Sequence, residues 1–260
     1  MPTHRRARSQ EAKQQRAEDL LDAARRLAAE AGGVRHLTLA AVTEAAGLHP
    51  SAIRRYFDNK EELLLELAER EWVGWREEVL RRAKAGAGRG RGAGAGPDTG
   101  VGAGPDTGAG AGPDTGAGAG LGPDETADVL ATSLIARPLL CDLFTHIPLS
   151  LEGEVPLERA RRYKALSFAS VAKMSAALAE AGTMTAAQVA DLIAATAAQT
   201  AHAWQIAHPT ATLAALYEEN PQWAHTAYDF GERTTRLLRA TARGLAARGP
   251  GPGDSGPSRG

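Results

Sequence analysis

The sequence predicts an all-α protein, and three observations support this. Apolar residues recur at helical spacing through most of the 260 residues, and no segment alternates apolar and polar residues as a strand would. Helix-capping and helix-ending residues separate these segments. Hydrophobic residues make up 43% of the chain, enough for two modest cores. We therefore expect an N-terminal three-helix domain followed by a C-terminal helical domain.

An amphipathic helix comes first and ends at Gly32-Gly33. Its apolar stripe consists of Ala17, Leu20, Leu21, Ala24, Leu27 and Ala28. Residues 1–16 before this stripe are mostly basic and polar. Their charged side chains, with Glu11 the one acid among them, are Arg5, Arg6, Arg8, Lys13 and Arg16. We expect residues 1–16 to be a flexible basic arm.

Residues 38–57 predict two short helices joined by a tight turn. Thr38 can cap the first helix by accepting a backbone N–H. Gly47 stands where this helix must stop, because glycine tolerates the left-handed conformation. Pro50 fits the first position of the next helix, where its missing N–H costs little.

The second of these helices has a buried and an exposed side. The spacing predicts that Ile53 and Phe57 face the core. The polar side chains that remain facing solvent are Ser51, Arg54 and Arg55. This pattern is typical of a helix-turn-helix, which places side chains in the DNA major groove. The alternative is an ordinary helical hairpin with a basic face in water.

A further helix is predicted from Lys60 into the low 80s. Asn59 is its expected cap, and Glu62 stands three residues on, as in a capping box.

With these motifs in place, residues 10 to 80 resemble the DNA-binding domain of the TetR family of bacterial transcriptional repressors. The features that carry the resemblance are Thr38 at the cap, Ala45-Ala46-Gly47-Leu48, Tyr56-Phe57 and Asn59-Lys60-Glu61-Glu62-Leu63-Leu64. The resemblance implies that residues 17–60 are a helix-turn-helix DNA-binding domain and that residues 61–84 are a connecting helix.

The resemblance also implies a role for individual positions. Those that match base-facing positions are Pro50, Ser51 and Arg54. Those that match phosphate-contacting positions are Thr38, Arg55, Tyr56 and Lys60. Arginine pairs with guanine edges, whereas lysine and the tyrosine hydroxyl suit phosphate oxygens. Three positions depart from the family pattern: the Arg54-Arg55 pair, Ala52 in place of a hydroxyl residue, and Thr43 in place of a small alanine. In this family such an arm can lie along the DNA backbone or enter the minor groove; a disordered, solubilising tail is the alternative.

Residues 85–124 have a different composition. The unit Gly-Ala-Gly-Ala-Gly-Pro-Asp-Thr recurs there with few apolar side chains, which predicts a disordered repeat linker. Beyond it, residues 125–248 are again helical, and residues 249–260 are expected to be a disordered tail. The helices that we expect run from Leu157 to Ala181, from Thr185 to about His208, from Thr210 to Asn220, and from about Gln222 to Ala247.

The same resemblance implies that residues 125–248 are the regulatory and dimerisation domain. In this family the last two long helices of two subunits form the dimer interface, which we assign to about Thr185–Ala207 and Gln222–Ala247. A small, largely apolar effector would bind among the middle helices. The residues that we expect to line this effector pocket are Phe144, Phe168, Met174, His202 and Trp204. The implied function is a homodimeric repressor that the effector releases from a palindromic double-stranded DNA operator.

Other functions have weaker support. The net charge is −1, so DNA binding needs a local basic patch. Cys141 and His146 are the one close Cys/His pair, and without a supporting motif we do not expect an enzyme, a cofactor or a metal. A redox-responsive regulator using Cys141 and a transcriptional activator are the alternatives. The charged N-terminus, the single cysteine and the lack of a long apolar run predict a cytoplasmic protein with no membrane partner.

Overall fold

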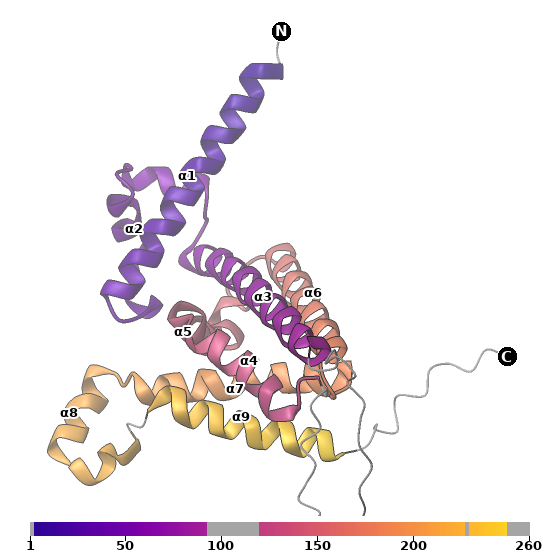
Figure 1. Cartoon of the computed structure of the whole chain (residues 1–260). Helices are drawn as coiled ribbons and strands as arrows, with labels where there is room; N and C mark the ends of the chain where they lie inside the picture. Colours follow the sequence, from indigo (N-terminus) through magenta and orange to yellow (C-terminus); the bar gives the residue numbers. More distant parts are fainter. Residues whose placement is uncertain (1–2, 93–119, 227–228, 249–260) are drawn as a thin grey trace, which may run out of the picture.

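The structure, a computed structural model, describes residues 3–92, 120–226 and 229–248. Within these ranges the chain is helical and has no strand, so the predicted all-α class is confirmed (Figure 1). Its α-helices are α1 (Thr3–Glu30), α2 (Leu39–Ala45), α3 (Lys60–Gly92), α4 (Pro123–Ile135), α5 (Pro138–His146), α6 (Leu157–Ala181), α7 (Ala186–Ala207), α8 (Ala211–Glu219) and α9 (Phe230–Ala247). Shorter 3₁₀ or π elements are η1 (Val34–His36), η2 (Pro50–Arg55), η3 (Ile147–Leu151) and η4 (Pro221–Thr226).

Helices α1 and α2, with η1 and η2, form the N-terminal unit, residues 3–57. Its core contains Leu20, Leu21, Val34, Val42, Ile53 and Phe57, all buried. The flexible arm predicted over residues 1–16 is corrected, because residues 3–16 are helical and continue α1. The reason is that residues 3–30 contain neither glycine nor proline and consist largely of good helix formers. Figure 1 shows this end of α1 projecting away from the rest of the molecule.

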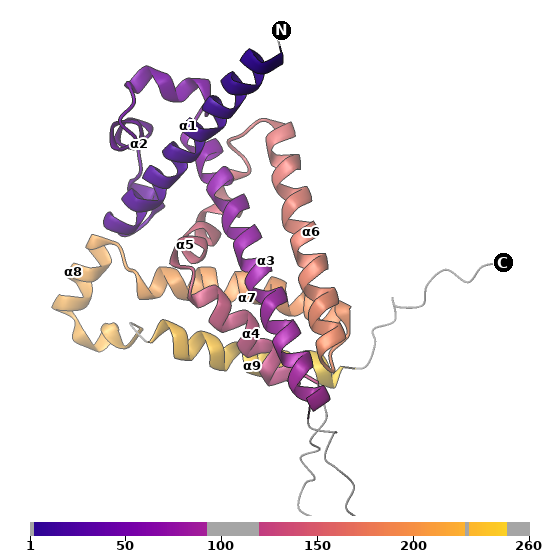
Figure 2. The ribbon, with the colours of Figure 1, turned by 45° about the horizontal axis from the view of Figure 1, so that its top comes forward.

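The long helix α3 runs from the N-terminal unit along the whole C-terminal unit, residues 120–248, and lies beside α6 (Figure 2). The buried Arg159 of α6 pairs with Glu69 of α3 at 2.5 Å, which holds the two helices together. In the C-terminal unit α7 packs against α5, α6 and α9, and α9 also packs against α4. Helix α3 therefore contacts both units and connects them.

The linker predicted over residues 85–124 is corrected at both ends. Residues 85–92 belong to α3, and residues 93–119, which hold the repeats, lie outside the described residues. Leu121 packs where Gly86 of α3 has no side chain: a Cβ on Gly86 would lie 2.7 Å from the Leu121 side chain. The Leu121 N–H donates to Ala181 at 2.8 Å, and its carbonyl accepts from Thr183 at 2.9 Å. The chain is thus anchored immediately before α4.

The predicted helices of the C-terminal unit agree with the structure except at the last one. The capping box of Thr185 and Gln188 opens α7 as predicted. Helix α9, however, begins at Phe230 and not near Gln222. Asp229 caps it by accepting the N–H of Glu232 at 2.9 Å, while residues 221–226 form η4. The tail at 249–260 lies outside the described residues.

Candidate nucleic-acid interface

The turn between α2 and η2 forms through local capping contacts. Thr38 caps α2 because its Oγ1 accepts the N–H of Ala41 at 3.2 Å. Gly47 has φ of +68°, the left-handed conformation that the sequence predicts for it. The Leu48 N–H returns to the Thr43 carbonyl at 3.0 Å. Thr43 itself is fully buried, and its hydroxyl donates to the Leu39 carbonyl at 2.5 Å, so this departure from the family pattern leaves no unpaired group.

The short helix predicted after the turn is a 3₁₀-helix, η2. Pro50 begins it, and His49 caps it through Nδ1, which accepts the Ser51 N–H at 3.3 Å. This capping role of His49 was not predicted from the sequence. The buried and exposed sides are as predicted. Ile53 and Phe57 are buried, whereas Ser51, Arg54 and Arg55 are exposed and Tyr56 is half-buried.

The first residues of α3 contact the residue pair before the helix and the 3₁₀-helix η1. Asn59 caps α3 by accepting the Glu62 N–H at 2.8 Å, as predicted, but Glu62 reaches back to the N–H of Asp58 and not to that of Asn59. The Lys60 ammonium donates to the Arg35 carbonyl at 2.9 Å. Partial burial lowers the pKa of Lys60 below its usual range. Lys60 is thus half-buried and already hydrogen-bonded to Arg35, whereas Thr38 and Arg55 are exposed.

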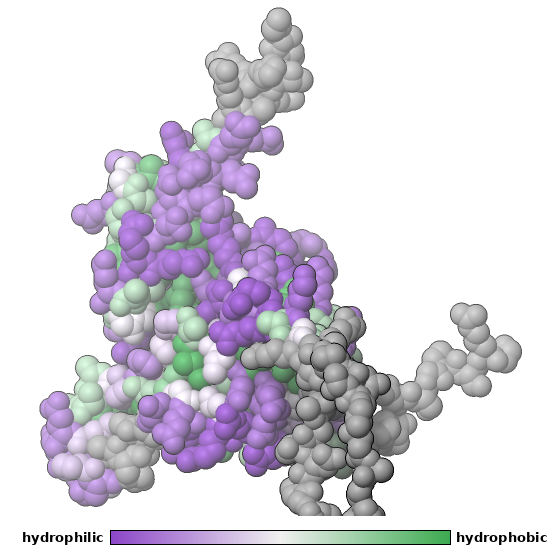
Figure 3. All heavy atoms as spheres, in the orientation of Figure 1, coloured by the Kyte–Doolittle hydropathy of each residue, from purple (hydrophilic) through white to green (hydrophobic). Residues whose placement is uncertain are grey.

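Positive charge extends beyond η2 along the same unit. Lys13 and Arg16 are exposed on the projecting part of α1, and Arg35 is exposed on η1. Figure 3 shows this part of the surface as strongly hydrophilic. Residues 3–57 contain ten Lys or Arg against six Asp or Glu, so this unit is net positive although the whole chain has a net charge of −1. Such a surface suits the phosphate backbone of DNA.

A cavity of about 800 Å³ lies among α3, α5, α6 and α7. Of the five residues predicted to line an effector pocket, Phe144, Phe168 and His202 line this cavity. Trp72 and Tyr163 also line it, and the Trp72 indole N–H donates to the Tyr163 hydroxyl at 2.9 Å. Trp72 and Phe144 meet edge to face with ring centroids 5.3 Å apart. The cavity therefore has an aromatic wall that can bind an apolar molecule.

The structure does not bring the other two predicted pocket residues to this cavity. Met174 is fully buried in the core. Trp204 stacks on His208 with ring centroids 3.7 Å apart and lines a different cavity. His202 and Trp204 stand two residues apart on α7, so they point to different sides of the helix.

Two acidic residues line the cavity, Glu152 and the exposed Asp191, and sequence reasoning missed both. Glu152 follows η3, and one of its carboxylate oxygens pairs with Lys164 at 2.9 Å. Its other oxygen is buried and has no hydrogen-bond partner among the described residues. No helical periodicity identifies a residue in such a turn, so only the three-dimensional structure reveals it.

The Cys141 and His146 pair offers no reactive centre. Cys141 is fully buried, and its thiol donates to the Leu134 carbonyl at 3.3 Å. Burial raises the pKa of Cys141 to about 12, so the thiolate is scarce at neutral pH. Burial also lowers the pKa of His146. Across the described ranges, no group of three His, Cys, Asp or Glu side chains is arranged to hold a metal ion. No described helix is long and apolar enough to cross a membrane.

Comparison with known proteins agrees with this architecture. Residues 20–67 match the family described as bacterial regulatory proteins, tetR family. Residues 108–249, more than half of the chain, match the tetracyclin repressor-like C-terminal domain. No curated protein sequence matches the chain. The two family matches coincide with the helix-turn-helix and with the helical unit that holds the aromatic cavity, and the chain therefore belongs to the TetR family of DNA-binding transcriptional regulators.

Proposed function

We propose that the protein is a dimeric repressor that leaves a palindromic operator when a small, largely apolar effector binds its C-terminal unit. The exposed face of η2 carries the DNA-binding half of this proposal. Arg54 is exposed there, next to the buried Ile53 within the element, and Phe57 is buried just after it. We assign base contacts to Pro50, Ser51 and Arg54, and phosphate contacts to Thr38, Arg55, Tyr56 and Lys60.

The experiment begins with selection of bound genomic fragments, followed by footprinting, which identifies the operator. Arg54→Ala should then weaken operator binding by roughly 1–3 kcal/mol and relax the preference at one position in each half-site. Arg55→Ala should weaken operator and random DNA alike, because a phosphate contact carries no sequence information. Arg55 is a better test of this class than Lys60, which also holds the Arg35 carbonyl.

Arg161→Ala is the matched control, because Arg161 is exposed on α6 and pairs there with Glu158. It should leave both affinities unchanged. Equal losses on operator and random DNA for Arg54→Ala would contradict the base-reading role. The position of the operator relative to the promoter separates a repressor from an activator.

The proposed dimer interface is the outer face of α7 and α9. These helices pack against each other, with the Gln199 amide donating to Thr241 at 3.0 Å. Small or apolar residues that are exposed on these helices and do not line the aromatic cavity are Ala187, Leu237, Ala240 and Gly244. Small side chains let helices of two subunits approach closely, and a two-fold axis matches a palindromic site.

The oligomeric state tests this interface. Leu237 is 44% exposed on α9, so a glutamate at this position should not disturb a folded monomer but should disrupt the proposed interface. We expect Leu237→Glu to sediment as a monomer. The matched control is Leu157→Glu, since Leu157 is also exposed but lies on α6. A dimer that persists in Leu237→Glu would refute the assignment.

The effector is assigned to the aromatic cavity among α3, α5, α6 and α7. The unpartnered oxygen of Glu152 favours a ligand that presents one hydrogen-bond donor to it. Compounds that raise the melting temperature identify candidates, and an effector must also lower operator affinity. Phe168→Ser should weaken the binding of such a compound, because Phe168 lines the cavity. Phe168 is 67% exposed, so its replacement should not disturb the core. Trp204→Ala, outside this cavity, is the control. Equal binding of the compound to free and operator-bound protein would rule out effector control.

A further inference from the structure

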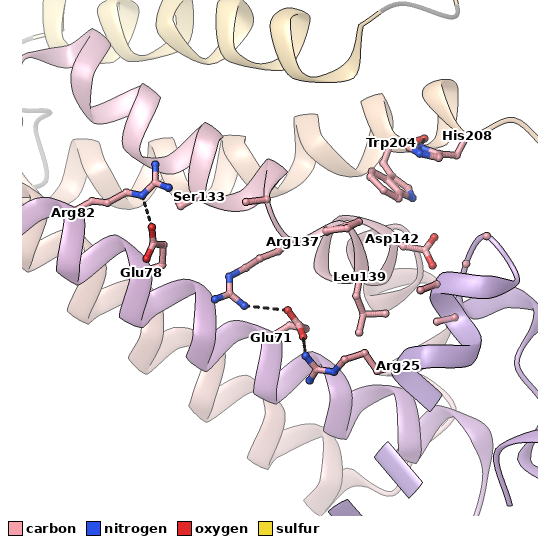
Figure 4. A pocket seen from close by; sticks show the side chains of 16 residues that line it. Arg25, Glu71, Glu78, Arg82, Ser133, Arg137, Leu139, Asp142, Trp204 and His208 are labelled. Atoms are coloured by element: carbon pink, nitrogen blue, oxygen red, sulfur yellow. Dashed lines mark hydrogen bonds and ion pairs between the residues drawn. The ribbon is translucent and has the colours of Figure 1, made fainter. Parts of the chain in front are cut away.

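A second cavity, of about 640 Å³, lies where the N-terminal unit meets the C-terminal unit (Figure 4). Helix α1 and the Gly32-Gly33 turn form one side of it, and α3, the α4–α5 corner and the end of α7 form the other. It shares no lining residue with the aromatic cavity. Of the five residues predicted to line an effector pocket, Trp204 alone lies here.

Three arginines and three acids line this junction cavity, and the cations gather around one of the acids, Glu71. Glu71, only 5% exposed, lies between two guanidinium groups, and Figure 4 shows both ion pairs. Arg25 of α1 pairs with one of its oxygens at 2.9 Å, and Arg137 of the α4–α5 corner pairs with the other at 3.2 Å. A guanidinium has five N–H donors, so both arginines keep donors beyond those that meet Glu71. Two positive charges thus share one carboxylate.

The other two acids of the cavity already have partners elsewhere. Glu78 accepts from Arg81 and Arg82. Asp142 accepts the backbone N–H of Val34 at 2.7 Å. Neither acid pairs with Arg25 or Arg137, so at Glu71 itself two guanidinium groups face one carboxylate. The partner of Asp142 is a neutral N–H, so Asp142 keeps its negative charge at the cavity.

Arg137 lies against α3 at a position without a side chain. A Cβ on Gly74 would lie 2.6 Å from Nη1 of Arg137, so a larger residue at 74 would displace the guanidinium. The remaining walls are mostly apolar and include Ala28, Leu139 and Trp204. Figure 3 shows apolar residues reaching the surface near α5, between the two units. The cavity therefore combines a fixed cationic end with an apolar body.

We propose that the junction cavity is a binding site for a monocarboxylate with an apolar body, whose carboxylate pairs with Arg25 and Arg137. An anionic acceptor uses the guanidinium donors that Glu71 does not occupy, and charge-assisted hydrogen bonds of this type are the strong ones. The apolar body lies against the alanines, Leu139 and the Trp204–His208 stack. Because Arg25 and Arg137 belong to different units, the bound acid joins the DNA-binding unit to the regulatory unit. The proposal is independent of the effector assigned to the aromatic cavity.

Isothermal titration calorimetry of the full chain with 2-naphthoate tests the site, and 2-naphthamide is the uncharged ligand of matched shape. We expect 2-naphthoate to bind and 2-naphthamide to bind at least about tenfold more weakly, since hydrogen bonds to charged groups are worth that much. Arg25→Gln should weaken 2-naphthoate by about tenfold or more for the same reason. Glu71→Gln should strengthen it, because the competing carboxylate is removed. A merely structural ion pair would predict weaker binding in both variants.

Phe168→Ser is the control for binding in the aromatic cavity and should leave 2-naphthoate affinity unchanged. Melting curves of each variant establish that it is folded. If Glu71→Gln does not fold, Arg25→Gln still tests the site, because Glu71 then keeps its ion pair with Arg137. The proposal is overturned if 2-naphthoate does not bind at about 1 mM, a concentration that detects even weak sites. It is also overturned if 2-naphthamide binds equally well, or if Phe168→Ser and not Arg25→Gln abolishes binding.

Discussion

Asp142 of α5 should hold the N-terminal unit against the C-terminal unit, and its removal should free the chain at Val34. Its Oδ2 accepts the Val34 N–H at 2.7 Å, a contact between residues 108 positions apart. Gly33, with φ of +141°, lies directly against the carboxylate, since a Cβ there would be 3.1 Å from Oδ2. Asp142→Ala removes the acceptor and leaves the N–H of Val34 without this partner.

The geometry sets the expected size of the effect. A hydrogen bond to a charged group contributes about 1.5–3 kcal/mol. The Asp142 side chain is only 14% exposed, so water can replace the lost acceptor only in part. We therefore expect local opening at Val34 to become easier by about 2 kcal/mol, which is roughly 30-fold in the opening equilibrium.

Amide hydrogen exchange measured by NMR reports this opening directly. The Val34 amide should exchange roughly 30-fold faster in Asp142→Ala. Asp142→Asn, which keeps an acceptor oxygen, should recover much of the protection. Asp128→Ala is the control, since Asp128 pairs with Arg239 within the C-terminal unit. If Asp142→Ala changes Val34 exchange by less than about threefold, the carboxylate does not join the two units.

Three further predictions concern stability. Leu121→Ala should lower the free energy of unfolding in a urea melt by about 1–2 kcal/mol, less than the same substitution costs at a fully buried leucine. An unchanged free energy of unfolding would mean that the contact with α3 is not formed. Burial holds the pKa of His146 below 6.5, so the stability contributed by its neutral ring is present above pH 6.5 and is lost as the pH falls. In thermal melts between about pH 7.5 and 5.5, the melting temperature of His146→Gln should therefore fall less steeply than that of the unchanged protein. Arg159→Ala should cost about 1–3 kcal/mol, because the buried Glu69 loses one of its two arginine partners and keeps Arg162. Arg161→Ala on the exposed side of α6 should cost less than about 1 kcal/mol in the same urea melt.

Local signals explain why the helix-turn-helix was predictable. Thr38, Gly47 and Asn59 act on backbone groups within a few residues, so the sequence alone identifies their roles. The start predicted for α9, near Gln222, was wrong because the last helix was placed directly after the end of the preceding one, where η4 lies. Asp229 and Glu232 hold a cap with the same spacing as the predicted ones, and this signal was present but overlooked.

Contacts between distant segments explain what could not be predicted. Helical spacing assigns a residue to a face of its helix, but not to the neighbour that this face meets. Met174 and Phe168 both lie on α6, yet one is fully buried and the other is largely exposed beside the cavity. The pairing of Arg25 with Glu71, and of Asp142 with Val34, joins positions far apart in the chain. No periodicity in the sequence indicates such pairs.

Helix α5 is the element that can transmit effector binding to the DNA-binding unit. Phe144 lies at the aromatic cavity, and Asp142, two residues earlier, lies on another side of the helix against Val34. A ligand that pushes the backbone at Phe144 also moves its neighbours on α5, because backbone hydrogen bonds join successive turns of this nine-residue helix. That movement alters the Asp142–Val34 contact at the same time. Loss of the contact should therefore reduce the effect of the ligand on operator affinity while leaving its affinity for free protein nearly unchanged. Coupling and binding are then separate quantities, and the ratio of ligand affinities with and without operator measures the coupling alone.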